Sequence, residues 1–148
     1  MRKKAWVVGF LTLTVCFFNV SQAEENSRIA AHYKSEVEPL FRKACFDCHT
    51  NQTRFPWYHS IPGVKQWMDH HIEEAQEELK FSEDFLFTGE GSPEKKLRKI
   101  WKEIEEGEMA PFYYRLMHRE ARLGSDEKEK IKTWVQFALK ELGYAPLE

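Results

Sequence analysis

Apolar and polar residues along most of the chain follow the period of an amphipathic helix, with apolar residues three or four positions apart. The pattern occurs in four stretches that we predict to be helices, namely 35–44, 62–79, 93–106 and 125–142. No stretch shows the alternation of apolar and polar residues that is typical of a half-buried β-strand. The sequence therefore predicts an all-α fold, a small domain of about four helices.

Local signals mark where some of these helices begin and end. Ser35 and Glu38 have the spacing of a capping box, which favours a helix that starts at residue 35. Ser92 followed by Pro93 combines an N-cap residue with a proline in the first turn. Gly107 is a typical residue just beyond a helix end. These signals predict a helix over residues 93–106.

The first 23 residues differ from the rest of the chain. Three positive charges in the first four residues precede an apolar run over residues 5–18, and small residues follow at positions 21 and 23. This is the layout of a secretory signal peptide, and the apolar run is shorter than the roughly 20 residues of a membrane-spanning helix. We predict a signal peptide over 1–23 and a periplasmic or otherwise exported domain over 24–148. An uncleaved N-terminal membrane anchor is the alternative, and no other segment predicts a span.

The charge of the predicted domain bears on its partners. Residues 1–23 contain three Lys and Arg and no Asp or Glu, so the remainder has 19 Lys and Arg against 24 Asp and Glu. Binding to nucleic-acid phosphates requires clustered Lys and Arg, so a mildly acidic domain is not expected to bind nucleic acid. Its acidic surface favours partner proteins with a basic docking surface.

The cysteines indicate a cofactor. Cys16 lies in the apolar run, which leaves Cys45 and Cys48 in the predicted domain, with His49 directly after them. Cysteines three positions apart on a helical turn can both form thioether bonds to the vinyl groups of one haem, and the next residue can coordinate its iron. A dithiol redox site and half of a zinc site are the alternatives. The motif predicts one covalently attached haem c.

The iron of a low-spin electron carrier needs a second axial ligand, usually a methionine sulfur or a histidine nitrogen. Met109 follows a predicted helix end and precedes Ala110 and Pro111, so it lies in a restricted loop. It is 60 residues beyond His49, which is enough chain to reach the other face of the haem. We predict Met109 as the sixth ligand, with His118 as its rival and an ordinary buried methionine as the plain alternative.

Aromatic residues cluster beside both candidate ligand segments. They are Phe55, Trp57, Tyr58, Phe112, Tyr113 and Tyr114. We expect them to pack around the haem, although a plain hydrophobic core is the commoner place for aromatic residues in a small domain.

Three segments together resemble a bacterial haem-binding domain family of exported CxxCH proteins. Residues 45–58 (CFDCHTNQTRFPWY) are similar to its pattern Cys-x-x-Cys-His-Ser-Asn-x-Thr-x-Trp-Pro-Trp-Tyr, with Thr50 and Phe55 at the two positions that differ. Residues 107–111 (GEMAP) resemble its Gly-x-Met-Pro-Pro element. Residues 116–123 (LMHREARL) resemble its Leu-x-His-Pro-x-Ala-x-Leu segment. One proline is replaced in each of the last two segments.

This resemblance covers about residues 32–142. It implies a cytochrome-c-like helical domain wrapped around one haem, with Cys45 and Cys48 as attachment points and His49 as an axial ligand. It does not decide between Met109 and His118, and it implies the cofactor more directly than any pathway.

The leading functional hypothesis is a monohaem c-type cytochrome that carries one electron as its iron cycles between Fe(III) and Fe(II). Its partners would be redox proteins, and it would be a carrier rather than a catalyst. A haem enzyme with peroxidase-like activity and a haem-based ligand sensor are the alternatives. The single haem motif and the small predicted domain favour electron transfer.

Overall fold

The computed structural model describes residues 22–81, 85 and 87–148, so the predicted signal peptide falls almost wholly outside the described residues. The structure is mostly helical with almost no strand, which confirms the all-α prediction. Helical residues 22–32 are followed by η1 (Tyr33–Val37), α2 (Glu38–Ala44), α3 (Phe46–His49), η2 (Trp57–Ser60), α4 (Val64–Glu78), β1 (Leu79–Lys80), β2 (Thr88–Gly89), α5 (Pro93–Glu106), α6 (Phe112–Met117), η3 (Arg119–Ala121) and α7 (Ser125–Glu141). In the part of the chain that is described, no helix has the length and apolar character needed to cross a membrane.

The first helical segment begins earlier than the sequence predicts. Residues 22–32 are already helical and continue directly into η1 and α2. Ile29 and Val37, eight positions apart, are both fully buried, so the apolar stripe of this segment starts upstream of the predicted capping box. Ser35 therefore lies inside the helical run and caps nothing, and its hydroxyl donates to the backbone carbonyl of His32.

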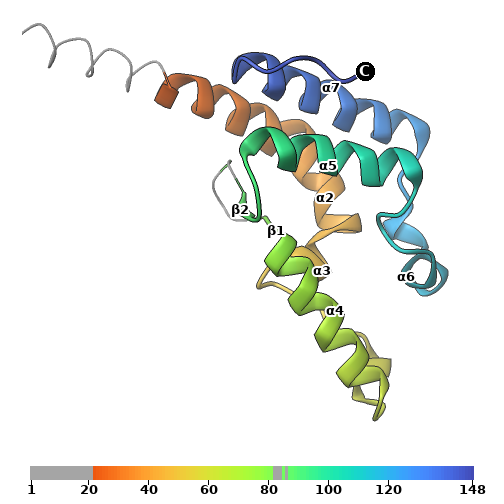
Figure 1. The fold of residues 1–148 in the computed structure, drawn as a ribbon. Coiled ribbons are helices and arrows are strands. Elements are labelled where there is room, and N and C mark those ends of the chain that lie inside the picture. Colours follow the sequence, from red (N-terminus) through yellow and green to blue (C-terminus); the bar gives the residue numbers. More distant parts are fainter. Residues whose placement is uncertain (1–21, 82–84, 86) are drawn as a thin grey trace, which may run out of the picture.

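A bundle of α5, α7 and the segment containing η1 and α2 holds the hydrophobic core (Figure 1). Trp134 of α7 is fully buried, and its ring contacts the rings of Tyr33, Phe41 and Phe87. A buried aromatic side chain removes about 150–250 Å² from water, which stabilises the fold by roughly 4–6 kcal/mol at the usual value per unit area. The aromatic core therefore lies in this bundle.

Helix α5 begins and ends where its local signals predict. The Ser92 side chain accepts a hydrogen bond from the backbone N–H of Lys95, and Pro93 is the first helical residue. Gly107 ends the helix in the left-handed conformation, at φ 78°. The apolar stripe of the helix is buried and consists of Leu97, Ile100, Trp101 and Ile104.

Helix α4 extends away from the bundle (Figure 1). The predicted span of 62–79 is close to its observed bounds, but the apolar stripe that its periodicity marks is not covered by a neighbouring layer. None of its residues is fully buried, and Trp67 is 43% exposed. The reason is that α4 packs mainly against the short elements α3, η2, β1 and β2, with further side-chain contacts from Tyr113 of α6 and Lys99 of α5, and these do not cover one face of a long helix.

A short hairpin ties the end of α4 to α3. Leu79 of β1 pairs with Gly89 of β2 in antiparallel register. Gly89 has φ 117°, and a Cβ atom there would lie 2.5 Å from the carbonyl oxygen of Glu78, so this close approach requires glycine. Just beyond β1, the backbone N–H of Phe81 donates to the carbonyl of His49 at 2.9 Å. The hairpin thus fixes the backbone that follows the predicted haem motif.

Candidate functional site

Three predicted site residues lie on the turn that joins α2 to α3. Cys45 follows the last residue of α2, while Cys48 and His49 belong to α3. The backbone N–H groups of Cys48 and His49 both donate to the carbonyl of Cys45, at 3.1 and 2.9 Å. Both cysteines are free thiols, and this compact turn places all three residues in the wall of one cavity.

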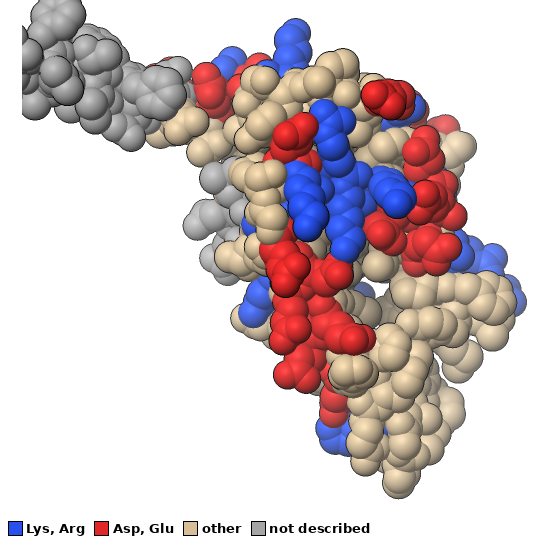
Figure 2. Space-filling view, in the orientation of Figure 1, with Lys and Arg blue, Asp and Glu red and all other residues tan. Residues whose placement is uncertain are grey.

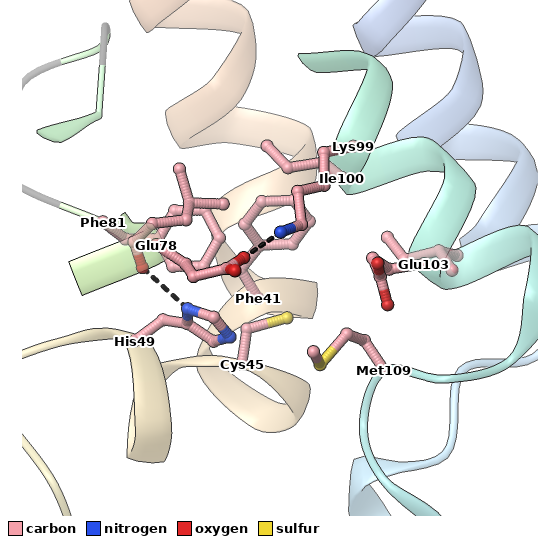
Figure 3. Close-up of a pocket in the computed structure, with 11 residues that line it drawn as sticks. Phe41, Cys45, His49, Glu78, Phe81, Lys99, Ile100, Glu103 and Met109 are labelled. Atoms are coloured by element: carbon pink, nitrogen blue, oxygen red, sulfur yellow. Dashed lines mark hydrogen bonds and ion pairs between the residues drawn. The ribbon is translucent and has the colours of Figure 1, made fainter. Parts of the chain in front are cut away.

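The imidazole of His49 is held in a defined orientation. Its Nδ1 atom lies 2.7 Å from the backbone carbonyl oxygen of Leu79, so Nδ1 carries the proton and donates it. The second ring nitrogen, Nε2, points into the cavity beside Cys45 (Figure 3). Burial lowers the pKa of His49, which favours the neutral ring. A neutral ring whose other nitrogen donates to a backbone carbonyl is the usual state of a metal-ligating histidine.

The cavity beside these residues has a volume of about 510 Å³, within the usual range for cofactor sites. Its wall comes from the α2–α3 turn, from α4 and from the segment around Met109 that follows α5. A smaller apolar cavity adjoins it and shares Cys45, His49 and Met109. The thioether of Met109 faces the same space as the sulfur of Cys45 (Figure 3). Two thiols, one imidazole and one thioether around one cavity, with an apolar cavity adjoining it, fit a haem.

The thiols of the two cysteines are protonated at neutral pH. Burial raises the pKa of Cys45 to about 12, and the nearby Cys48 adds to this effect. Burial likewise raises the pKa of Cys48 to about 11, with a further contribution from Asp47. Catalytic dithiols have lowered pKa values, so this arrangement does not favour the dithiol redox alternative. Nor does any group of three or more His, Cys, Asp or Glu within the described ranges form a metal-binding cluster, so the zinc alternative gains no support.

His118, the rival sixth ligand, does not line the cavity. The hydroxyl of Tyr58 lies 2.7 Å from its Nε2 atom, and a carboxylate oxygen of Glu120 lies 3.2 Å from its Nδ1 atom. The ring also stacks on Tyr114, with ring centres 4.3 Å apart. Both ring nitrogens of His118 are therefore already hydrogen-bonded, while the other four candidate residues share the cavity.

The predicted aromatic lining is found only in part. Tyr113 and Tyr114 line the cavity, whereas Phe55, Trp57 and Phe112 are exposed. The exposed rings belong to η2, α6 and the loop before η2, which are short segments without a neighbouring layer to cover their outer faces. Most buried aromatic rings lie instead in the bundle core.

Two parts of the site are absent from the sequence-based prediction. Glu74, Glu77 and Glu78 of α4 line the cavity, and their spacing does place them on one helix face. The sequence carries no signal, however, that tells which way this face points. The Leu79 carbonyl that orients His49 is a backbone group, so no residue type identifies it.

Comparisons with known proteins support haem binding. Residues 8–137 match the model of a haem-binding domain, a match that covers most of the chain and begins inside the predicted signal peptide. The sequence is also similar to cytochrome c peroxidase Ccp of Escherichia coli (strain K12), with 23% identity over 149 residues. That alignment covers 91% of this chain and 32% of the relative, so the chain spans about a third of the relative's length. No solved structure matches the fold.

Proposed function

This chain belongs to the haem-binding domain family, and on that basis we propose that its cavity holds one haem c and that the protein carries single electrons. The observation that supports this proposal most directly is that Cys45, Cys48, His49 and Met109 line the same cavity. They come from two segments that lie 60 residues apart in the sequence. A plain hydrophobic core would not require two thiols, an oriented imidazole and a thioether around one space.

Each of these residues has its own part in the proposal. Cys45 and Cys48 would attach the cofactor through thioether bonds, which prevent its loss from an exported protein. His49 would provide one axial ligand through Nε2, and Met109 would provide the other through sulfur, which raises the reduction potential relative to a second histidine. The bound haem supplies one-electron chemistry between Fe(III) and Fe(II).

Surroundings of the ligands favour an electron carrier. Apolar residues of the smaller cavity, including Phe41 and Ile104, keep water from the side of His49 and Met109. Exclusion of water and the number of nearby charges tune the reduction potential of a haem site. If His49 and Met109 both bind the iron, they would leave no coordination position for a substrate.

A peroxidase is the second candidate function, because the similar protein from Escherichia coli is named a cytochrome c peroxidase. The alignment covers only 32% of that relative, so its name does not tell which part of it carries the activity. In this chain, peroxide chemistry would require that Met109 leave the iron or never bind it.

We further propose that the protein is exported to the periplasm or a similar compartment, as its N-terminal sequence predicts. Its partners would be redox proteins with a basic docking surface. Acidic side chains gather over α4 (Figure 2). Three of them, Glu74, Glu77 and Glu78, line the large cavity proposed to hold the haem, here called the haem cavity. Complementary charges of this kind support weak and salt-sensitive docking.

Visible spectroscopy of protein matured in a host that attaches haem c tests the proposal. We expect a far-red ferric band of methionine-ligated iron that is lost in Met109→Ala and kept in His118→Ala. If the band is absent, or if Met109→Ala leaves the spectrum unchanged, the assignment of Met109 is wrong.

Attachment and activity need separate measurements. In a denaturing gel, haem should stay with the unchanged polypeptide and separate from the Cys45→Ala/Cys48→Ala variant. Haem that stays with this variant in the gel would contradict the covalent attachment. Low-spin spectra in both oxidation states without a reaction with peroxide would exclude the peroxidase. A rapid reaction with peroxide would overturn the electron-carrier proposal.

A further inference from the structure

Acidic side chains dominate the polar part of the large cavity. Its wall contains the carboxylates of Asp47, Glu74, Glu77, Glu78 and Glu90, and no described Lys or Arg side chain. A haem carries two propionate groups, which are ionised at neutral pH like other carboxyl groups. A carboxylate placed among like charges is destabilised. The propionates of a haem in this cavity therefore need a cationic partner at its edge.

Such partners lie on α5. Lys99 lines the small apolar cavity together with Cys45, His49 and Met109. It also lines a third, neighbouring cavity together with Lys95 and Lys96. Among the described Lys and Arg side chains, these three are the ones that line any of the three adjoining cavities. Figure 2 shows the Lys and Arg side chains over α5 directly beside the acidic side chains over α4.

Of the three lysines, Lys99 is the one that lines the small cavity shared with Cys45, His49 and Met109. The ammonium of Lys96 already donates to the backbone carbonyl of Phe87 at 2.7 Å, and Lys95 is exposed. Lys99 forms an ion pair with Glu78, a residue that lines all three cavities. In Figure 3 the Lys99 side chain extends from α5 to this pair, and the sulfur of Cys45 faces the same cavity.

Another carboxylate can easily replace Glu78 as the partner of Lys99 in this ion pair. The Lys99 side chain is 42% exposed and the Glu78 side chain is 54% exposed. Ion pairs between exposed groups contribute little to stability, so Glu78 can turn to solvent at small cost. In haem, the propionates are on the pyrrole rings that carry no vinyl groups, so attachment at the cysteines leaves both propionates free for another partner.

We propose that Lys99 is the propionate anchor of this site, an inference that rests on the proposed haem function. A haem propionate replaces Glu78 as the partner of the Lys99 ammonium, and the Glu78 carboxylate moves into solvent. Lys99 is thus a ligand-binding residue, and Glu78 competes with the cofactor for it.

The affinity for haem is compared with the affinity for haem dimethyl ester, whose propionates carry no charge. The difference between the two affinities measures the contribution of the propionate anchor apart from haem binding in general. The full-length Cys45→Ala/Cys48→Ala protein, in which haem can bind only non-covalently, is titrated with each ligand. Lys99→Gln should weaken binding of haem roughly tenfold relative to binding of the ester, as expected for the loss of a charge-assisted hydrogen bond. Lys99→Arg should keep the preference for haem, and Glu78→Gln should strengthen haem binding.

Lys102→Gln is the matched control, because Lys102 is an exposed lysine of the same helix that lines none of the three cavities. It should leave the preference for haem unchanged. An equal effect of Lys99→Gln and Lys102→Gln, or no effect of Lys99→Gln, overturns the anchor and leaves the haem site intact. If neither ligand binds to any variant, the haem cavity itself is wrong, and the anchor with it.

The reduction potential of the matured protein provides a second measurement that does not depend on the cysteine variant. Loss of Lys99 removes a positive charge and leaves a propionate unpaired, and both changes favour Fe(III). Lys99→Gln should therefore lower the potential more than Lys102→Gln does, and equal shifts would contradict the proposal.

Discussion

The hydroxyl of Tyr114 donates a hydrogen bond to Oδ2 of Asp47 at 2.7 Å, although 67 residues separate them in the sequence. Asp47 lies between the two cysteines of the motif and also accepts from Nε of Arg54 at 3.1 Å. Burial, followed by the hydrogen bond to Asp47, raises the pKa of Tyr114, so its hydroxyl remains a donor. Through this bond, α6 holds the turn that carries Cys45 and Cys48.

Tyr114→Phe should lower the free energy of unfolding by about 1.5 kcal/mol, because a hydrogen bond to a charged group is lost while the ring remains. Urea unfolding followed by circular dichroism measures the change. Tyr113→Phe is the matched control, since no hydrogen bond of the Tyr113 hydroxyl occurs within the described part of the chain. Equal midpoints for the two variants would show that the bond to Asp47 contributes nothing.

Gly89→Ala should destabilise the protein more than Gly63→Ala. Both glycines have a positive φ, 117° and 87°, so both substitutions strain the backbone. Only at Gly89 does the new Cβ atom also meet a neighbouring backbone, at 2.5 Å from the Glu78 carbonyl oxygen. We expect a further cost of at least about 1 kcal/mol from this contact, measured by urea unfolding of both variants. A larger loss for Gly63→Ala would be inconsistent with the close approach.

Two tryptophans provide a test of where the core lies. Trp134→Ala should lower the free energy of unfolding by about 3–5 kcal/mol, because it removes a fully buried ring from the aromatic core. Trp57→Ala should change it by less than about 0.5 kcal/mol, because that side chain is 76% exposed. Thermal and urea unfolding of the two variants measure the difference, and similar losses would place the core elsewhere.

An ion pair between α2 and α7 makes stability depend on pH. The ammonium of Lys43 donates to Oε1 of Glu127 at 2.6 Å, and the backbone N–H of Gly124 donates to Oε2 at 2.8 Å. These two bonds lower the pKa of Glu127 in the folded protein below its ordinary value of 4.5. The unfolded chain therefore binds more protons in this range. The stabilisation is complete above the ordinary value and is lost as the pH falls through the folded value.

Lys43→Met should accordingly reduce the loss of stability between about pH 6 and about pH 3. Urea midpoints at both pH values measure this difference. Lys34→Met is the control, since Lys34 takes part in no ion pair within the described ranges. If Lys43→Met shows the same dependence on pH as the unchanged protein, the pair does not contribute.

The fold was predictable where its signals are local. Ser92 and Gly107 lie directly at the ends of α5, and each acts through its own side chain or backbone conformation, so the sequence predicts both ends correctly. The burial of α4 could not be predicted in the same way. Periodicity identifies an apolar face but not whether another element covers it, and in this protein mainly short elements pack against α4.

The same distinction between local signals and distant contacts applies to the candidate site. Cys45, Cys48 and His49 are neighbours in the sequence, so one helical turn is enough to bring them together. His118 is different, because its position depends on a hydrogen bond to Tyr58, which lies 60 residues away. Contacts over such distances follow from how helices pack, and no local pattern in the sequence records them.

The hairpin that follows α4 holds His49 at two points, the ring through the carbonyl of Leu79 and the backbone through the N–H of Phe81. If Nε2 binds the iron of a haem, a shorter hydrogen bond at Nδ1 would make the ring a stronger electron donor and the iron easier to oxidise, and a longer bond would do the reverse. The acidic helix on which a redox partner would dock is continuous with this hairpin. A small displacement of α4 at the moment of docking would therefore change the driving force of the electron transfer that docking permits.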